Sequence, residues 1–233
     1  MWFVVIITIF FTIGIIKLNK EGKKTRMEEF KDAQKTEELL NEINEDIKKE
    51  LSEERYKHSV GVMKKAEELA KIYRVNISEA KLVGLAHDIA KEMPKEAKFK
   101  YVEEKNIKID EIEKINIGLL HGKIGADICK KRYDFSTDMQ KAIEYHTTGN
   151  PNMNMLAKII FVADKTEEGR SYSNAERQKE LEELRQISTI DINKAVQIAI
   201  DESIVYTIQK GGLIHPDGIA TRNKLLSEKF VTM

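Results

Sequence analysis

The segment LVGLAHDIAK at residues 82–91 sets a histidine and an aspartate side by side within an otherwise apolar run. A second apolar segment, KIIFVADKTEE at residues 158–168, carries an acid, Asp164, in its interior. Both segments are typical of buried helices, in which an unpaired carboxylate costs several kcal/mol. Asp88 and Asp164 therefore need cationic partners, and the fold has to bring such partners to both helices.

The rest of the chain after Met27 also has helical periodicity. Apolar residues recur at three- and four-residue intervals, and no stretch alternates for long as a strand would. Ser52 is expected to cap a helix that runs to about Tyr73, and Ser78, Ser136 and Asp191 are expected to cap three later helices. Pro94 is expected in the first turn of a further helix. Gly211 and Gly212 are expected to end a helix that begins near Ile192. The sequence predicts an all-α fold with helices of about 10–20 residues and short loops.

Composition narrows the functional classes. The 233 residues include 39 Lys and Arg, 39 Asp and Glu, and a single cysteine, Cys129. One cysteine excludes an intramolecular disulfide and a cysteine-based zinc cluster, and is typical of the reducing cytosol. Residues 1–26 carry five basic residues and one acid, a net charge of +4, so residues 27–233 carry −4. A net negative body without a basic patch argues against nucleic-acid binding.

The N-terminus differs from the rest of the chain. Residues 1–16 contain no charge, and Lys17 begins a basic cluster. A membrane span needs about 17–25 apolar residues, and Leu18 with snorkelling lysines extends the run toward that length. We expect residues 1–18 to tether the protein to the inner membrane, with the following domain in the cytoplasm. The alternatives are a buried helix and a translation start at Met27.

The remaining chain divides into two expected parts. Residues 27–50 predict a charged amphipathic linker helix, which either lies on the body or forms a solvated stalk. Residues 51–233 are expected to form the main domain, with residues 1–26 as a separate leader.

The histidines carry the strongest chemical signal. The five are His58, His87, His121, His146 and His215. Taken singly, each is more often a structural histidine than a ligand. The two buried acids change this weighting, because imidazole and carboxylate together bind divalent or trivalent metal ions. The sequence therefore predicts a metal centre without cysteine ligands.

Six ordered segments resemble one known family. His58, the His87-Asp88 pair and Asp164 match the H…HD…D signature of the HD-domain metal-dependent phosphohydrolases. Over about residues 50–229 the chain resembles the YqeK-type symmetrical bis(5'-nucleosyl)-tetraphosphatases of bacteria. The matching segments are YKHSVGVMKKAEELA (56–70), GLAHDIAKEMP (84–94), LLHGKIGADI (119–128), AIEYHTTGNPNM (142–153), KIIFVADKTEEGR (158–170) and IHPDGIATRNKLL (214–226). The resemblance implies an HD-domain helical bundle that hydrolyses diadenosine tetraphosphate to two ADP.

The resemblance also implies roles for single residues. Its metal ligands correspond to His58, His87, Asp88 and Asp164, with His121 and His146 as ligands of a second site or as phosphate contacts. Iron is the first metal implied, and manganese, cobalt and magnesium are alternatives. The implied substrate contacts are His58, Asp88, His121, His146, Thr147, Asp164, Arg170, Thr207, Lys210, Gly211 and Gly212.

The expected catalytic residues are Asp88 and Lys91. Asp88 takes up the proton of the attacking water or orients that water. Lys91, one helical turn after His87, holds a phosphate or orients the water. Arg170 is expected to fork onto a phosphate or stack on a base, and Glu167 to orient Arg170 or to cap the structure. His215 is expected to be structural.

Two rival functions fit the same residues. Another HD-type phosphohydrolase, such as a nucleotidase, a nucleoside triphosphatase or an alarmone hydrolase, would share the ligands. A catalytically weak, membrane-tethered nucleotide sensor would account for the N-terminal segment. The expected partners are a dinucleoside polyphosphate or nucleotide substrate and a second copy of the chain in a homodimer.

Overall fold

The structure, a computed structural model, describes residues 34–231, and every regular element within that range is a helix. The chain divides into two compact units, residues 1–41 and residues 42–233. Residues 34–50 are helical. The helices that follow are α2 (Glu53–Tyr73), α3 (Ile77–Ala86), α4 (Lys95–Glu104), α5 (Glu111–Ile115), the 3-10 helix η1 (Ile117–Leu119), α6 (Leu120–Tyr133), α7 (Thr137–Tyr145), α8 (Met155–Thr166), α9 (Ala175–Ser188), α10 (Ile192–Gln209) and α11 (Pro216–Val231). The predicted all-α fold is confirmed for the described residues.

Local capping sets where most helices begin. The predicted N-caps at Ser52, Ser136 and Asp191 are confirmed, since each side chain accepts a hydrogen bond from the backbone N–H three residues later. The prediction for Ser78 is wrong. Asn76 caps α3 instead, by accepting from the N–H of Glu79, so Ser78 already lies inside the first turn. Pro94 stands at the cap position of α4, just before the first turn.

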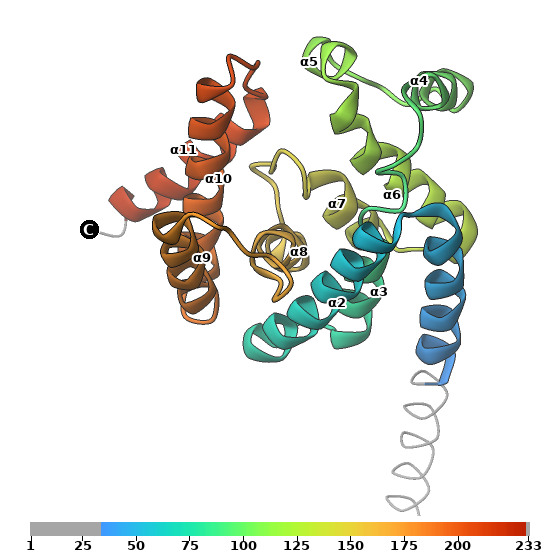
Figure 1. The fold of residues 1–233 in the computed structure, drawn as a ribbon, viewed down its shortest axis with the longest axis horizontal. Helices are drawn as coiled ribbons and strands as arrows, with labels where there is room; N and C mark the ends of the chain where they lie inside the picture. The colour runs from blue at the N-terminus through green and yellow to red at the C-terminus, as the bar shows by residue number, and fades with distance from the viewer. Residues whose placement is uncertain (1–33, 232–233) are drawn as a thin grey trace, which may run out of the picture. The chain divides into compact units, whose positions relative to one another are not determined.

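Helix α8 lies at the centre of the second unit (Figure 1). Helices α2, α3 and α7 pack against it, as does α10. Most of its positions are buried, including Ile159, Ile160 and Phe161. Asp164 occupies one of these buried positions, so its carboxylate is directed into the protein.

The His87-Asp88 pair does not continue the helix, contrary to the prediction. Helix α3 ends at Ala86, and residues 87–92 form turns in which the N–H of Lys91 donates to the carbonyl of Asp88 over 2.8 Å. The ring of His87 binds the carbonyl of Gly84 at 2.8 Å. That carbonyl is the acceptor that the N–H of Asp88 would need in a continued helix. The helix therefore ends at the point where the His87 ring bonds to its last turn, and both His87 and Asp88 are buried.

The end of the predicted linker helix lies on the body of the second unit. Ile43 and Ile47 are fully buried. The hydroxyl of Tyr133 donates to Asp46 over 2.8 Å, and Arg132 donates to Glu50 over 2.5 Å. For residues 42–50 this favours a helix on the body over a solvated stalk, while the domain boundaries stay predictions.

Between residues 34 and 231, no helix combines the length and the apolar character that crossing a membrane requires. The predicted tether at residues 1–18 and the alternative start at Met27 lie outside the described residues. Both stay predictions.

Candidate metal centre

Four histidine rings from separate parts of the chain meet in the interior. His58 comes from α2, His87 follows α3, His121 lies in the first turn of α6, and His146 follows α7. The ring centroids of successive neighbours lie 5.4, 5.0 and 4.9 Å apart, in the order His58, His87, His146, His121. The last three residues are at most 2% exposed. The cluster is therefore closed to bulk water on most sides.

Three of the rings are oriented in the same way, each by a carbonyl of its own segment. In each case Nδ1 lies beside the backbone carbonyl three residues earlier. The pairs are His87 with Gly84 at 2.8 Å, His121 with Gly118 at 2.5 Å, and His146 with Ile143 at 2.6 Å. A carbonyl can only accept, so Nδ1 carries the proton and Nε2 keeps its lone pair. All three Nε2 atoms are therefore available as ligands.

Two carboxylates lie among these nitrogens. Oδ1 of Asp88 is 3.1 Å from Nε2 of His121 and 3.4 Å from Nε2 of His146. Oδ1 of Asp164 is 3.0 Å from Nε2 of His58 and 3.8 Å from Nε2 of His87. The other oxygen of Asp88, Oδ2, is 3.6 Å from Nε2 of His87. Asp88 therefore joins the two halves of the cluster.

The protonation states leave negative charge in this buried cluster. Burial lowers the pKa of His87 and of His121 to about 4, so both rings are neutral at pH 7. Burial alone would raise the pKa of Asp88, but the neighbouring histidines hold it well below its usual range. Burial would likewise raise the pKa of Asp164, which Lys165 and His58 keep low. Both acids are thus anionic, which is the form in which a carboxylate binds a metal ion.

The donor atoms fit such a cation. Nε2 of His58, Nε2 of His87 and Oδ1 of Asp88 are buried without a well-aligned hydrogen bond, although other polar atoms lie close. Unpaired buried polar atoms are rare and often mark an ion site. His58, His87 and Asp88 can hold one ion, and Asp88, His121 and His146 a second. Asp164 adds a carboxylate oxygen beside the first group.

The sequence prediction missed two cations of the site, Arg55 and Lys165, and identified a third, Lys91. Arg55 Nη1 lies 3.0 Å from Oδ2 of Asp88. Its position one helical turn before His58 on α2 is the signal that would have identified it. Lys165 Nζ lies 2.8 Å from Oδ2 of Asp164. Lys91, predicted from the sequence, has its Nζ 3.3 Å from Nε2 of His121 and is 37% exposed at its side chain.

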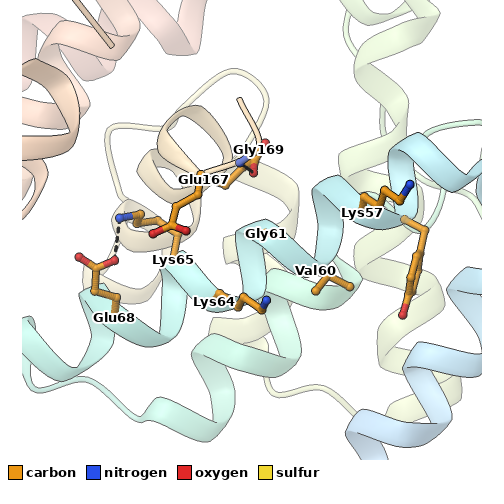
Figure 2. A pocket seen from close by; sticks show the side chains of 10 residues that line it. Lys57, Val60, Gly61, Lys64, Lys65, Glu68, Glu167 and Gly169 are labelled. Carbon is orange, nitrogen blue, oxygen red and sulfur yellow. Dashed lines mark hydrogen bonds and ion pairs between the residues drawn. The ribbon is translucent and has the colours of Figure 1, made fainter. Parts of the chain in front are cut away.

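The sequence predicts that Glu167 orients Arg170 or caps the structure, and the observed carboxylate accepts from a backbone N–H but contacts His58. Oε1 of Glu167 lies 3.2 Å from Nδ1 of His58, and Oε2 accepts from the N–H of Gly169 over 2.6 Å. The side chain lies against Gly61 of α2 (Figure 2). Burial would lower the pKa of His58, but Asp164 and Glu167 raise it. Glu167 therefore orients the one ring of the four that lacks a carbonyl partner.

Arg170 contacts Asp164, one of the predicted metal ligands. Its Nη2 donates to the backbone carbonyl of Asp164 over 2.8 Å and lies 3.5 Å from the Oδ1 of that residue. This arrangement supports Asp164, whereas the sequence predicted a contact with phosphate or base.

Of the other residues predicted to bind substrate, some line a common cavity and some do not. Thr147, Thr207 and Gly212 line a cavity of about 150 Å³ with Phe161 of α8. Lys210 and Gly211 are not among the residues that line this cavity. Gly211 has a φ of 64° and ends α10, as predicted, while Lys210 Nζ lies 5.7 Å over the ring of Tyr206.

His215 has the structural surroundings that the sequence predicts. Its Nε2 lies 2.8 Å from Oδ2 of Asp110. Asp110 and Glu113 form a reciprocal capping box at the start of α5, and Lys123 donates to Glu113 over 2.7 Å. The carboxylates beside His215 are therefore already engaged by protein groups.

Comparison with known proteins agrees with this site. The HD domain family matches residues 55–169. The symmetrical bis(5'-nucleosyl)-tetraphosphatase of Halalkalibacterium halodurans is 35% identical over 184 residues, which cover 78% of this chain and 95% of that protein. The protein of the same name from Bacillus subtilis is 32% identical over 182 residues, covering 78% and 94%. The crystal structure of a "predicted HD superfamily hydrolase involved in NAD metabolism" from Clostridium acetobutylicum has a TM-score of 0.75 and 38% identity, covering 81% of this chain and 97% of its own.

The matched region contains all of the histidines and acids that form the centre, from His58 to Asp164. The identities and the coverage extend over nearly the whole length of both relatives. The chain belongs to the HD-domain phosphohydrolases, in the family of the symmetrical bis(5'-nucleosyl)-tetraphosphatases.

Proposed function

We propose that the chain hydrolyses dinucleoside tetraphosphates and cleaves diadenosine tetraphosphate symmetrically into two ADP. The observation that carries this proposal is the buried cluster of four histidines and two aspartates with unpaired ligand atoms. The names of the two relatives support the substrate and the symmetry of the cut. A symmetrical cut requires attack on one of the two inner phosphorus atoms, so the middle of the tetraphosphate lies at the centre.

His58, His87, Asp88 and Asp164 would hold the metal ion, and His121 and His146 would hold a second ion together with Asp88. When bound, the metal supplies a water activated for attack and draws charge from a phosphoryl oxygen. Iron is the proposed metal, and imidazole with carboxylate suits manganese and cobalt as well. Magnesium prefers all-oxygen surroundings, which makes it the weakest of the four candidates.

The protein groups hold and orient the reactants. Arg55 binds Oδ2 of Asp88, so Oδ1 faces the metal centre, where Asp88 would orient the attacking water. The ammonium of Lys91, 3.8 Å from Oδ1 of Asp88, neutralises a phosphate oxygen beside the attacked phosphorus. The cavity at Thr147 and Thr207 takes the nucleoside of one ADP half.

The first experiment determines the products. The full chain, purified anaerobically, is incubated with ferrous iron and diadenosine tetraphosphate, and nucleotides are separated by ion exchange. ADP as the only product is expected. ATP with AMP would refute the symmetrical cut, and turnover of mononucleotides alone would favour another HD-type phosphohydrolase. Tight nucleotide binding without turnover would favour the sensor.

A variant of Asp88 tests the assignment of the centre. Asp88→Ala is expected to abolish both bound metal and turnover, because Asp88 contacts both halves of the cluster. Asp138→Ala, at an exposed acid in the first turn of α7, is the matched control and should retain both. An Asp88→Ala protein that is active and carries metal would contradict the assignment.

A cytoplasmic location, a tether through residues 1–18 and a homodimer remain part of the proposal. Mass spectrometry of the natively expressed protein tests whether residues 1–26 are translated, because starts at Met1 and Met27 differ by 26 residues. A start at Met27 would remove the tether from the proposal.

A further inference from the structure

A dinucleotide that is cut in its middle leaves one nucleoside on each side of the metal centre. The cavity at Thr147, Thr207 and Gly212 measures about 150 Å³. Small-molecule sites commonly measure about 300–1,000 Å³. A dinucleoside tetraphosphate therefore extends beyond this cavity, and its second nucleoside needs a separate surface.

A larger cavity, of about 500 Å³, lies between α9 and α10. It adjoins the metal centre through Lys165, which lines the cavity and whose Nζ is 2.8 Å from Oδ2 of Asp164. The same ammonium group lies 5.4 Å over the ring of Phe161, which lines the smaller cavity. Lys165 is thus a common neighbour of the metal centre and of both cavities.

The walls of the larger cavity suit a nucleobase. The guanidinium of Arg177 lies 4.3 Å over the ring of Tyr172. The N–H of Tyr172 donates to Oε1 of Gln178 over 2.8 Å, which fixes the loop that carries the tyrosine. Tyr206 of α10 also lines the cavity and is 53% exposed. Aromatic rings and arginine planes are the surfaces on which proteins stack bases.

The charges of the cavity favour a nucleoside over a free polyphosphate. Its two cations, Lys165 and Arg177, face three acids, Glu180, Asp201 and Glu202. Asp201 is already bound by Arg222 and Lys165 by Asp164, so one cation, Arg177, remains against two acids. A cavity with an excess of negative charge does not attract a polyanion, while its carboxylates can accept hydrogen bonds from purine amino groups. Lys165, next to the metal centre, is the group placed for the phosphate chain.

We propose that the cavity between α9 and α10 binds the second nucleoside of a dinucleoside tetraphosphate, with its base between Tyr172 and Tyr206 and Lys165 on the phosphate chain. This inference rests on the proposed function, because only a dinucleotide substrate has a second nucleoside to place. It makes residues outside the HD signature responsible for selecting dinucleotides over mononucleotides.

The kinetic test compares two substrates. Diadenosine tetraphosphate has the second nucleoside, and adenosine 5'-tetraphosphate lacks it. Stacking on one aromatic side chain changes binding by about tenfold. In the full chain with ferrous iron, Tyr172→Ala and Tyr206→Ala together are expected to lower the ratio of kcat/KM between the two substrates about tenfold, mainly through KM. Phe99→Ala, at an exposed aromatic residue of α4, is the control and should leave the ratio unchanged.

An unchanged ratio in the double variant would overturn the inference and leave the proposed function standing. No hydrolysis of diadenosine tetraphosphate by the wild-type chain would overturn both. A second measurement uses the metal-free wild-type chain and an azidoadenosine derivative of the dinucleotide. After irradiation, label on the tryptic peptide Ser171–Arg177 is expected, and label confined to other peptides would overturn the inference.

Discussion

Replacing Gly61 by alanine tests whether Glu167 positions His58 for the metal. Gly61 follows His58 by one turn of α2 and lies against Glu167 (Figure 2). An alanine Cβ at this position would lie 2.4 Å from Oε2 and 3.1 Å from Cδ of Glu167. Because such a contact is too short to persist, the carboxylate has to withdraw.

The required displacement is large enough to break the bond to His58. Oε2 of Glu167 must move from 2.4 Å to at least 3.0 Å from the new Cβ. The bond between Oε1 and Nδ1 of His58 is already 3.2 Å long, at the outer edge of the usual range. Losing the group that orients a metal-binding histidine costs about 10–100-fold in metal affinity. That factor corresponds to about 1.4–2.8 kcal/mol.

The same substitution should not weaken the fold. Alanine is favoured over glycine within a helix by about 0.5–1 kcal/mol. The clash involves the end of a side chain, so the backbones of α2 and the loop after α8 can keep their places. Metal affinity and thermal stability are therefore expected to change in opposite directions, which separates loss of positioning from loss of structure.

The assay measures manganese affinity by competition with a chromogenic chelator, and thermal unfolding of the metal-free chain. Gly61→Ala is expected to bind manganese about 10–100-fold more weakly, with an equal or higher Tm. Glu167→Gln, which introduces no clash, should weaken binding in the same direction. Glu168→Gln, at the exposed neighbouring acid, is the matched control and should bind as the wild type does.

A double variant gives the decisive comparison. If Gly61→Ala acts through Glu167, then adding it to Glu167→Ala produces no further loss, because both remove one interaction. Two losses that add, or wild-type affinity in Gly61→Ala, would refute the reasoning.

Three further predictions concern stability. Arg55→Met removes the cation that lies 3.0 Å from Asp88, and it should lower the free energy of unfolding of the metal-free chain by about 1–3 kcal/mol. In saturating manganese the loss should be smaller, because the bound ion balances the charge of Asp88. An equal loss in both denaturation experiments would contradict this. Gly84→Ala places a Cβ 2.9 Å from Cα of Met63, which forces α2 and α3 apart. The free energy of unfolding in urea should fall by about 1–3 kcal/mol, and a variant as stable as the wild type would disprove that contact. Burial raises the pKa of Glu144, so the folded chain holds this proton more tightly and stability falls as pH rises through that pKa. Glu144→Gln should therefore raise Tm at pH 7 but not at pH 4, and a gain that is equal at both pH values would argue against burial as the cause.

Much of the fold follows from local sequence. Periodic apolar residues with caps at Ser52, Ser136 and Asp191 predict helices that the structure contains. The start of α3 could not be chosen in this way, because Asn76 and Ser78 are both good cap residues two positions apart. Which one accepts the bond depends on the path of the preceding turn, and propensity does not determine that path.

The end of α3 illustrates a stronger limit. No glycine or proline follows Ala86 to stop the helix, so periodicity predicts that it continues through Asp88. The helix stops where the ring of His87 bonds to the carbonyl of Gly84. A bond between a side chain and a backbone carbonyl is not visible in a pattern of apolar residues. The turn that results is what brings Asp88 among the histidines.

The site was predictable in its residue types but less so in its contacts. The need of two buried acids for cations leads to a metal, and the four predicted histidines lie together. Arg55 and Glu167 were harder to place, since charged residues in charged segments usually face solvent. The role of Arg55 depends on α2 packing beside the end of α3, and that of Glu167 on α2 packing beside the end of α8. Neither contact can be read from the local sequence.

The four histidine rings are oriented by partners at different distances along the chain, and this difference should determine which substitutions weaken metal binding most. His87, His121 and His146 are each oriented by a carbonyl three residues earlier, so their own segments fix them. His58 is oriented by Glu167, more than a hundred residues later in the chain. A ligand that depends on distant packing is displaced more easily than one fixed by its own backbone. Metal affinity should therefore be most sensitive to changes where α2 meets the loop after α8, even when these changes contact no ligand atom.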